Sequence, residues 1–102
     1  MKLTDLSFIS HWEAGRLILN IPRCENYRKA CHTGKAAALE FTQYLTYSPY
    51  IGGDLQSIVF AISSHPEPDA IRGFTVGFFS TLEQVIRLAV TPRQNESEEQ
   101  AQ

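Results

Sequence analysis

One long stripe of apolar and small residues dominates this chain of 102 residues. Between Arg23 and Tyr47 such residues recur at steps of three and four, which places them along one face of an α-helix. The stripe consists of Tyr27, Ala30, Cys31, Gly34, Ala38, Phe41 and Leu45. We therefore expect a helix over residues 23–47, with the remaining segments arranged to cover its apolar face.

The segment before this helix favours a shorter helix over residues 11–20. Ser10 followed by Glu13 fits a capping box, in which each side chain binds a free backbone N–H of the first helical turn. Leu17, Ile18 and Leu19 leave an alternative open, because three adjacent apolar residues also suit a short buried strand. Pro22 then disfavours helix for the residue before it and suits the start of the next helix.

Two further helices are expected after a Pro/Gly loop over residues 48–53. Asp54 begins the first of them, and its core stripe would contain Leu55, Ile58, Val59 and Ile62. Over residues 69–90 the three- and four-residue steps favour one long helix, although a strand over 73–78 followed by a shorter helix is the alternative.

The expected fold class is all-α, a compact bundle of about four helices in a single domain, residues 1–92. A hydrophobic content of 43% with 20% charged residues is ordinary for a folded domain of this length. Thr91-Pro92 should end the last helix, because proline cannot continue the hydrogen-bond ladder. Residues 93–102 are polar and acidic, so we expect a disordered tail.

Three glycines at helical positions predict a close crossing of helices. Gly73 and Gly77 are four residues apart, so they lie on the same helix face. We expect them to admit the face of the long helix between Cys31 and Ala38. Gly34 weakens that helix by about 1 kcal/mol relative to alanine, so it marks either a break or a place where another helix crosses.

Residue types suited to catalysis or metal binding occur in the wrong arrangement. Cys24 and Cys31 would lie about 10 Å apart along one helix, which is too far for a disulfide. Cys31 and His32 would point about 100° apart, which suits neither a zinc site nor a cysteine–histidine nucleophile pair. We therefore expect a protein that is not an enzyme and has no metal or cofactor.

The N-terminus lacks a hydrophobic signal sequence, and no apolar run approaches 20 residues. We therefore expect no membrane segment and a cytoplasmic location with reduced cysteines. A local basic patch stands out on a chain with a net charge of −2. It comprises Arg16, Arg23, Arg28, Lys29 and Lys35. Arg23, Arg28 and Lys29 are candidates for docking a protein partner, and direct nucleic-acid binding by residues 16–35 is the alternative.

Two further features suggest contact with a protein. The segment His65-Pro66-Glu67-Pro68 has restricted backbone freedom, so it is either a connector between helices or a loop presented to a partner. Tyr47 and Tyr50 lie outside the apolar stripe beside the Pro/Gly loop, and tyrosine is enriched in interfaces. The candidate partner-binding residues are therefore His65, Pro66, Glu67, Pro68, Tyr47, Tyr50, Arg23, Arg28 and Lys29.

Residues 34–41 and 77–80, together with the loop carrying Pro66 and Pro68, resemble the small accessory proteins of lambdoid bacteriophages. The resemblance is to the phage-encoded anti-RecBCD proteins, and it covers about a fifth of the chain. It implies a non-enzymatic protein of the host cytoplasm that binds the RecC subunit and alters how the RecBCD nuclease handles DNA ends. It also implies that Pro68 is offered to a host prolyl isomerase.

Overall fold

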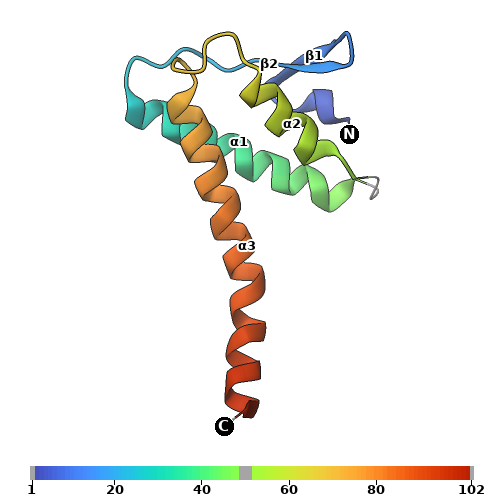
Figure 1. Cartoon of the computed structure of the whole chain (residues 1–102), viewed down its shortest axis with the longest axis vertical. Coiled ribbons are helices and arrows are strands. Elements are labelled where there is room, and N and C mark those ends of the chain that lie inside the picture. The colour runs from blue at the N-terminus through green and yellow to red at the C-terminus, as the bar shows by residue number, and fades with distance from the viewer. Residues whose placement is uncertain (1, 49–51, 102) are drawn as a thin grey trace.

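The computed structural model describes residues 2–48 and 52–101, with residues 91–101 described by their backbone only. A short 3-10 helix, Leu3–Asp5, leads into a hairpin of strands β1 (Ile9–Glu13) and β2 (Arg16–Leu19). Helices α1 (Tyr27–Tyr47), α2 (Asp54–Ser63) and α3 (Arg72–Ala101) follow. The hairpin, α1, α2 and the first part of α3 form one body, from which the rest of α3 projects (Figure 1).

The prediction of an all-α bundle of about four helices was wrong. Residues expected to form a helix over 11–20 instead form the antiparallel hairpin, in which Trp12 pairs with Leu17. Ala14 and Gly15 connect the strands with φ angles of 52° and 77°. Positive φ at both turn residues is the geometry of the tight hairpin turn that matches strand twist. The chain thus forms this turn instead of the helix start predicted from Ser10 and Glu13. The alternative prediction of a strand at Leu17–Leu19 was correct.

Helix α1 begins at Tyr27, later than the predicted start at Arg23. Asn26 precedes it in an extended conformation, and its side chain accepts a hydrogen bond from the backbone N–H of Lys29 at 2.8 Å. This N-cap satisfies one of the free donors of the first turn. Arg23 and Cys24 therefore lie in the extended segment before the helix, and Cys24 and Cys31 are both free thiols.

Residues 70–79 belong largely to α3, which settles the helix-or-strand alternative for that segment in favour of helix. The predicted end at Thr91-Pro92 was wrong, because the backbone remains helical to Ala101. One proline removes a single ladder hydrogen bond, and the Arg, Gln, Glu and Ala residues that follow Pro92 favour helix. The division into a domain of residues 1–92 and a separate tail stays a prediction.

The glycine crossing was predicted correctly. A Cβ atom added to Gly34 would lie 2.1 Å from the carbonyl oxygen of Phe74, and one added to Gly77 would lie 2.0 Å from that of Cys31. The backbones of α1 and α3 are thus in direct contact. Only glycine permits this approach, and Gly34 marks the crossing rather than a break in α1.

The core lies where α1 and α3 cross beneath the N-terminal segment. Phe8 packs against Phe74 and Phe78, with ring centroids 6.0 and 5.7 Å away. Phe41 of α1 lies 6.3 Å from Phe78. The buried hydrophobic residues are Leu3, Leu6, Phe8, Ile9, Leu17, Ala37, Ala38, Phe41, Tyr44, Ile58, Ala61, Ile62, Ile71, Phe74 and Phe78.

Two polar contacts attach neighbouring segments to α1. Glu40 accepts hydrogen bonds from the backbone N–H and the hydroxyl of Ser7, the latter at 2.7 Å, and so holds the N-terminal segment. The Tyr44 hydroxyl donates to the carboxylate of Asp54 at 3.0 Å, which ties the end of α1 to the start of α2. Both the N-terminal segment and α2 are thus attached to α1, and α2 also contacts β2 directly. No described helix is long and apolar enough to cross a membrane.

Candidate functional site

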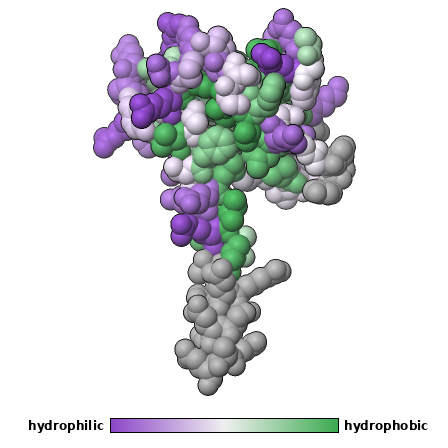
Figure 2. Space-filling model, in the orientation of Figure 1, coloured by the Kyte–Doolittle hydropathy of each residue, from purple (hydrophilic) through white to green (hydrophobic). Residues whose placement is uncertain are grey.

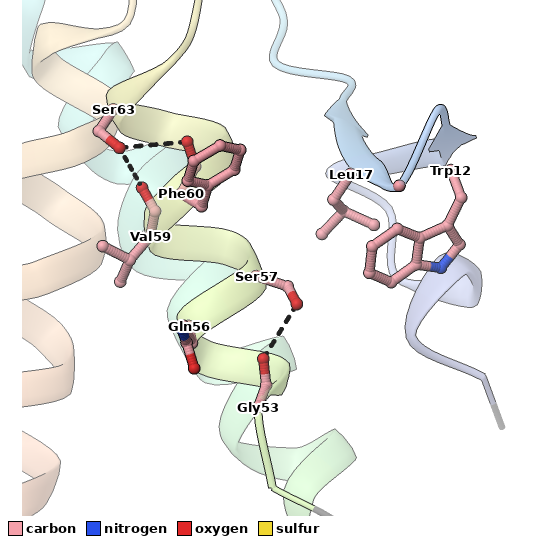
Figure 3. Close-up of a pocket in the computed structure, with 9 residues that line it drawn as sticks. Trp12, Leu17, Gly53, Gln56, Ser57, Val59, Phe60 and Ser63 are labelled. Carbon is pink, nitrogen blue, oxygen red and sulfur yellow. Dashed lines mark hydrogen bonds between the residues drawn. The ribbon is translucent and has the colours of Figure 1, made fainter.

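A groove runs between the hairpin and α2, and we call it the hairpin–α2 groove (Figure 3). The groove has a volume of about 500 Å³. Trp12, Gly15 and Leu17 line it from the hairpin. The lining from the segment of α2 consists of Gly53, Gln56, Ser57, Val59, Phe60 and Ser63. The groove therefore joins residues that lie about 40 positions apart in the chain.

The walls of this groove are open to solvent and combine apolar side chains with the uncharged polar side chains of Gln56, Ser57 and Ser63. Trp12 is 49% exposed, Val59 41% and Phe60 52%. The hydroxyls of Ser57 and Ser63 donate to carbonyl oxygens of the α2 segment itself, at 3.0 Å for Gly53 and 3.0 Å for Val59. Among the described residues that line this part, none has an acidic, basic or thiol side chain. Such a surface suits contact with apolar groups rather than acid–base chemistry.

Arg16 lines a hollow next to the groove and brings a positive charge to the groove's Phe60. Its guanidinium carbon lies 5.4 Å from the centroid of the Phe60 ring, within range of a cation–π interaction. A second hollow of about 260 Å³ adjoins the groove at Leu17. Leu17 lines both spaces, and His65 and Pro66 line the second. Together they lead from the tip of the hairpin to the predicted partner-binding loop.

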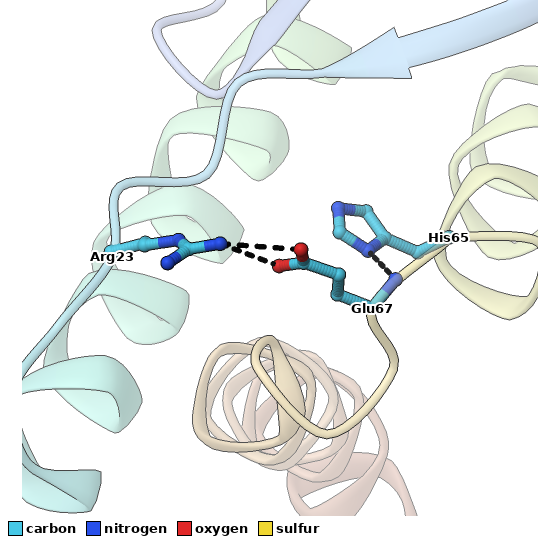
Figure 4. Close-up of polar contacts among 3 residues, drawn as sticks. All are labelled: Arg23, His65 and Glu67. Atoms are coloured by element: carbon cyan, nitrogen blue, oxygen red, sulfur yellow. Dashed lines mark hydrogen bonds and ion pairs between the residues drawn. The ribbon is translucent and has the colours of Figure 1, made fainter.

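The structure brings five of the predicted site residues together at this end. Arg23 Nη2 lies 3.2 and 3.1 Å from the two carboxylate oxygens of Glu67 (Figure 4). His65 Nδ1 accepts a hydrogen bond from the backbone N–H of Glu67 at 3.0 Å, and Pro66 and Pro68 are exposed on either side. The Arg23 and Glu67 side chains are 84% and 53% exposed, so their ion pair contributes about 0–1 kcal/mol to stability.

The other predicted residues lie elsewhere. Arg28 and Lys29 are exposed in the first turns of α1, and Tyr47, 73% exposed, lies at its far end. Twenty residues of helix span about 30 Å, so Tyr47 cannot share a contact point with Arg28. Tyr50 lies outside the described residues. The peptide bonds before Pro66 and Pro68 are both trans.

The first turn of α1 also contains a tyrosine–thiol contact. Tyr27 is 56% exposed, and a hydrogen bond with the Cys31 side chain raises the pKa of its hydroxyl above the usual value. In the described part of the chain, no group of three or more His, Cys, Asp and Glu side chains is placed to hold a metal ion.

Trp12, Arg16 and Phe60 were absent from the predicted site residues. One feature of the sequence could have indicated this site, because α2 has apolar residues on more than one face. Ile58 and Ile62 are buried, whereas Leu55, Val59 and Phe60 are exposed apolar residues of the same helix. A helix that is apolar nearly all round needs cover on every side. Leu55 and Val59 were assigned to the core stripe, yet they are 43% and 41% exposed.

Comparisons of the chain with known protein families, with curated proteins and with solved structures gave no match.

Proposed function

We propose that this chain is a non-enzymatic protein that binds a larger protein complex through the hairpin–α2 groove. The observation that carries the proposal is the exposure of Trp12, Val59 and Phe60 around one groove. Burying the exposed half of each side chain would contribute about 1 kcal/mol per residue. Tryptophan and arginine are also frequent among the residues that dominate interface energies, which fits Trp12 beside Arg16.

The loop over residues 65–68 extends this surface. His65 and Pro66 line the hollow that adjoins the groove, and the exposed Arg23–Glu67 ion pair links the loop to the segment before α1. A partner lying in the groove would therefore reach the two prolines. We propose that this loop is a second contact, and that Pro68 is where a host prolyl isomerase engages the chain.

The partner that we propose is the host RecBCD nuclease, bound through its RecC subunit in the host cytoplasm. The support is the resemblance of residues 34–41 and 77–80, with the loop of Pro66 and Pro68, to phage-encoded anti-RecBCD proteins. Such binding would alter how the nuclease processes DNA ends, and the chain itself would contribute contact area rather than catalysis.

Binding of the purified chain to immobilised purified RecBCD tests both parts of this proposal. Phe60→Asp should weaken binding at least about tenfold, because it removes apolar contact and buries a charge. Leu39→Asp is the matched control, since Leu39 is 47% exposed on α1 and should leave binding unchanged. Absence of binding by every form would refute the partner, whereas equal binding by both variants would refute the groove.

A second candidate function is nucleic-acid binding by the outer face of α1. Arg28, His32 and Lys35 are exposed at i, i+4 and i+7, so their side chains form one row. Binding of the isolated chain to duplex DNA that falls steeply with added salt would support this function. Loss of that binding in Arg28→Ala/Lys35→Ala, with RecBCD binding retained, would separate the two activities.

A further inference from the structure

The hollow that adjoins the groove follows the outer edge of β2, and we call it the β2-edge hollow. All four residues of β2, Arg16–Leu19, line it from one side. From the other side it is lined by Ala61, Ser64, His65 and Pro66. Neighbouring side chains of a strand point to opposite faces, so a space lined by four consecutive residues lies along the edge of the strand.

The register of the hairpin leaves backbone groups of β2 without a partner at this edge. The two-residue turn makes Glu13 and Arg16 a hydrogen-bonded pair, so Trp12 and Leu17 form the next, non-hydrogen-bonded pair. The N–H and C=O groups of Leu17, and of Leu19 two residues later, therefore point away from β1. In the described part of the chain, no backbone hydrogen bond joins Leu17 or Leu19 to any segment other than β1.

These unpaired groups belong to residues that are largely covered by protein. Leu17 is 2% exposed, and Leu19 is half-buried. Backbone N–H and C=O groups inside a protein are nearly always hydrogen-bonded, because an unpaired one costs free energy. An extended chain carries donors and acceptors at the spacing that a strand edge requires. The edge of β2 is therefore suited to pairing with one more strand.

The charges around the hollow favour an acidic strand. Arg16 is exposed, and its guanidinium contacts the Phe60 ring rather than a carboxylate. The Glu13 carboxylate, on the residue paired with Arg16 in the hairpin, lies 3.5 Å from Nε2 of His11 instead. His65 accepts a backbone hydrogen bond with Nδ1, so its neutral ring has a hydrogen on Nε2 that it can donate. None of the described residues that line the hollow is acidic.

We propose that an acidic, extended segment of the protein partner adds to β2 as a third strand. In this arrangement, which rests on the proposed function, the main chain of the segment pairs with Leu17 and Leu19. One of its carboxylates faces Arg16. Figure 2 shows mainly hydrophilic side chains at the upper rim of the body, where the loop between α2 and α3 lies. A polar segment that enters the hollow beside this loop meets such a surface.

A single backbone change at Leu19 tests the added strand. Cys24 allows the full chain to be made by ligating a synthetic peptide of residues 1–23 to a recombinant segment that begins at Cys24. An ester in place of the amide at Leu19 removes the outward N–H, so it should weaken binding to immobilised RecBCD by about five- to tenfold. The matched control is an ester at Ala14, which lies in the turn, outside the groove and the hollow. It should change binding less than about threefold, and circular dichroism should show the same helix content for both forms.

Model peptides test the same edge without RecBCD. The probes are acetyl-Thr-Glu-Val-Glu-Thr-amide and its counterpart with lysine in place of glutamate, titrated into the isotope-labelled chain. The acidic peptide should shift the amide resonances of Leu17 and Leu19. The basic peptide should bind at least about threefold more weakly, because it brings a like charge to Arg16. Arg16→Glu should reverse this preference.

The two experiments separate failure of the partner from failure of the added strand. An unmodified chain that does not bind RecBCD would refute the proposed partner, and the peptide titration would still test the edge of β2. Equal RecBCD binding by the two ester forms, unchanged Leu17 and Leu19 resonances with the acidic peptide, or equal affinity for the acidic and basic peptides would each overturn the third strand.

Discussion

Replacing Gly77 by alanine tests the contact between α1 and α3. The added Cβ would lie 2.0 Å from the carbonyl oxygen of Cys31 and 2.8 Å from its carbonyl carbon, whereas ordinary contacts begin at 3.4 Å. Both atoms belong to the backbone, so no side chain can rotate away. The distance must grow by about 1.4 Å, which requires α1 and α3 to separate or rotate.

The expected loss of stability follows from two opposing effects. Alanine improves helix propensity by about 1 kcal/mol over glycine. Overpacking costs about 1–3 kcal/mol and occasionally more, and a gap of 0.5–1 Å already removes a quarter to a half of each dispersion contact across the interface. Phe41 and Phe78 meet across this interface. Because the clashing Cys31 atoms belong to the backbone, we expect a cost at or above the top of that range, about 3–4 kcal/mol. After the gain in propensity, Gly77→Ala should reduce the free energy of unfolding by about 2–3 kcal/mol.

Urea unfolding followed by circular dichroism measures this change. The melting temperature should fall by about 10–20 °C for a domain of this size. Gly15→Ala is the control, because its Cβ would meet no atom within 4 Å and its φ of 77° costs only about 1–2 kcal/mol of backbone strain. A Gly77→Ala protein as stable as the unmodified chain would refute the close crossing.

Gly73 offers a compensated version of the same experiment. A Cβ at Gly73 would lie 2.5 Å from the Cβ of Ala30, which is a side-chain atom and can be removed. Gly73→Ala alone should destabilise the chain. Ala30→Gly/Gly73→Ala leaves helix propensity unchanged and should return stability to within about 1 kcal/mol of the original. A double variant no better than Gly73→Ala would show that these two residues are not in contact.

Three further predictions concern the groove and the loop. Trp12 is the only tryptophan of the chain and is half-exposed. Its fluorescence emission should therefore be that of a solvated indole, and the shift to longer wavelength in urea should be smaller than for a buried tryptophan. A strongly blue-shifted native spectrum would contradict an open groove. Arg23→Ala should change the free energy of unfolding by less than about 1 kcal/mol, because the ion pair with Glu67 is exposed. Urea titrations measure this change, and a larger loss of stability would mean that the pair is buried. Pro68→Ala should retain the helical circular dichroism signal and weaken RecBCD binding, whereas loss of folding would assign the proline a purely structural role.

The helices could be predicted from sequence where local periodicity and tertiary packing agree. Gly73 and Gly77 lie on one helix face, and small residues on the facing helix made the crossing predictable. The prediction of which residues of α1 face the core was less accurate, because Leu45 is 48% exposed and Tyr44 is buried in its place. The Tyr44 hydroxyl donates a hydrogen bond to the carboxylate of Asp54 across the loop, and such a partner is not encoded in helical spacing.

The hairpin and the groove could not be predicted in the same way. Ala14 adopts a positive φ that alanine seldom takes, so the turn had no strong local signal. The groove depends on the packing of the hairpin against α2, and the Arg23–Glu67 contact joins residues 44 positions apart. The loop of Pro66 and Pro68 was recognisable because prolines restrict the backbone, but its position beside the hairpin depends on the whole fold.

Hydrogen exchange of the chain with and without purified RecBCD tests the central claim most directly. Partner binding at the hairpin–α2 groove should slow exchange of backbone amides in residues 9–19 and 54–66. Amides over residues 28–39 of α1, none of which lines the groove, should exchange at the same rate in both samples. Protection confined to residues 28–39, or no protection in the hairpin and α2 when the complex is formed, would contradict the proposed docking surface.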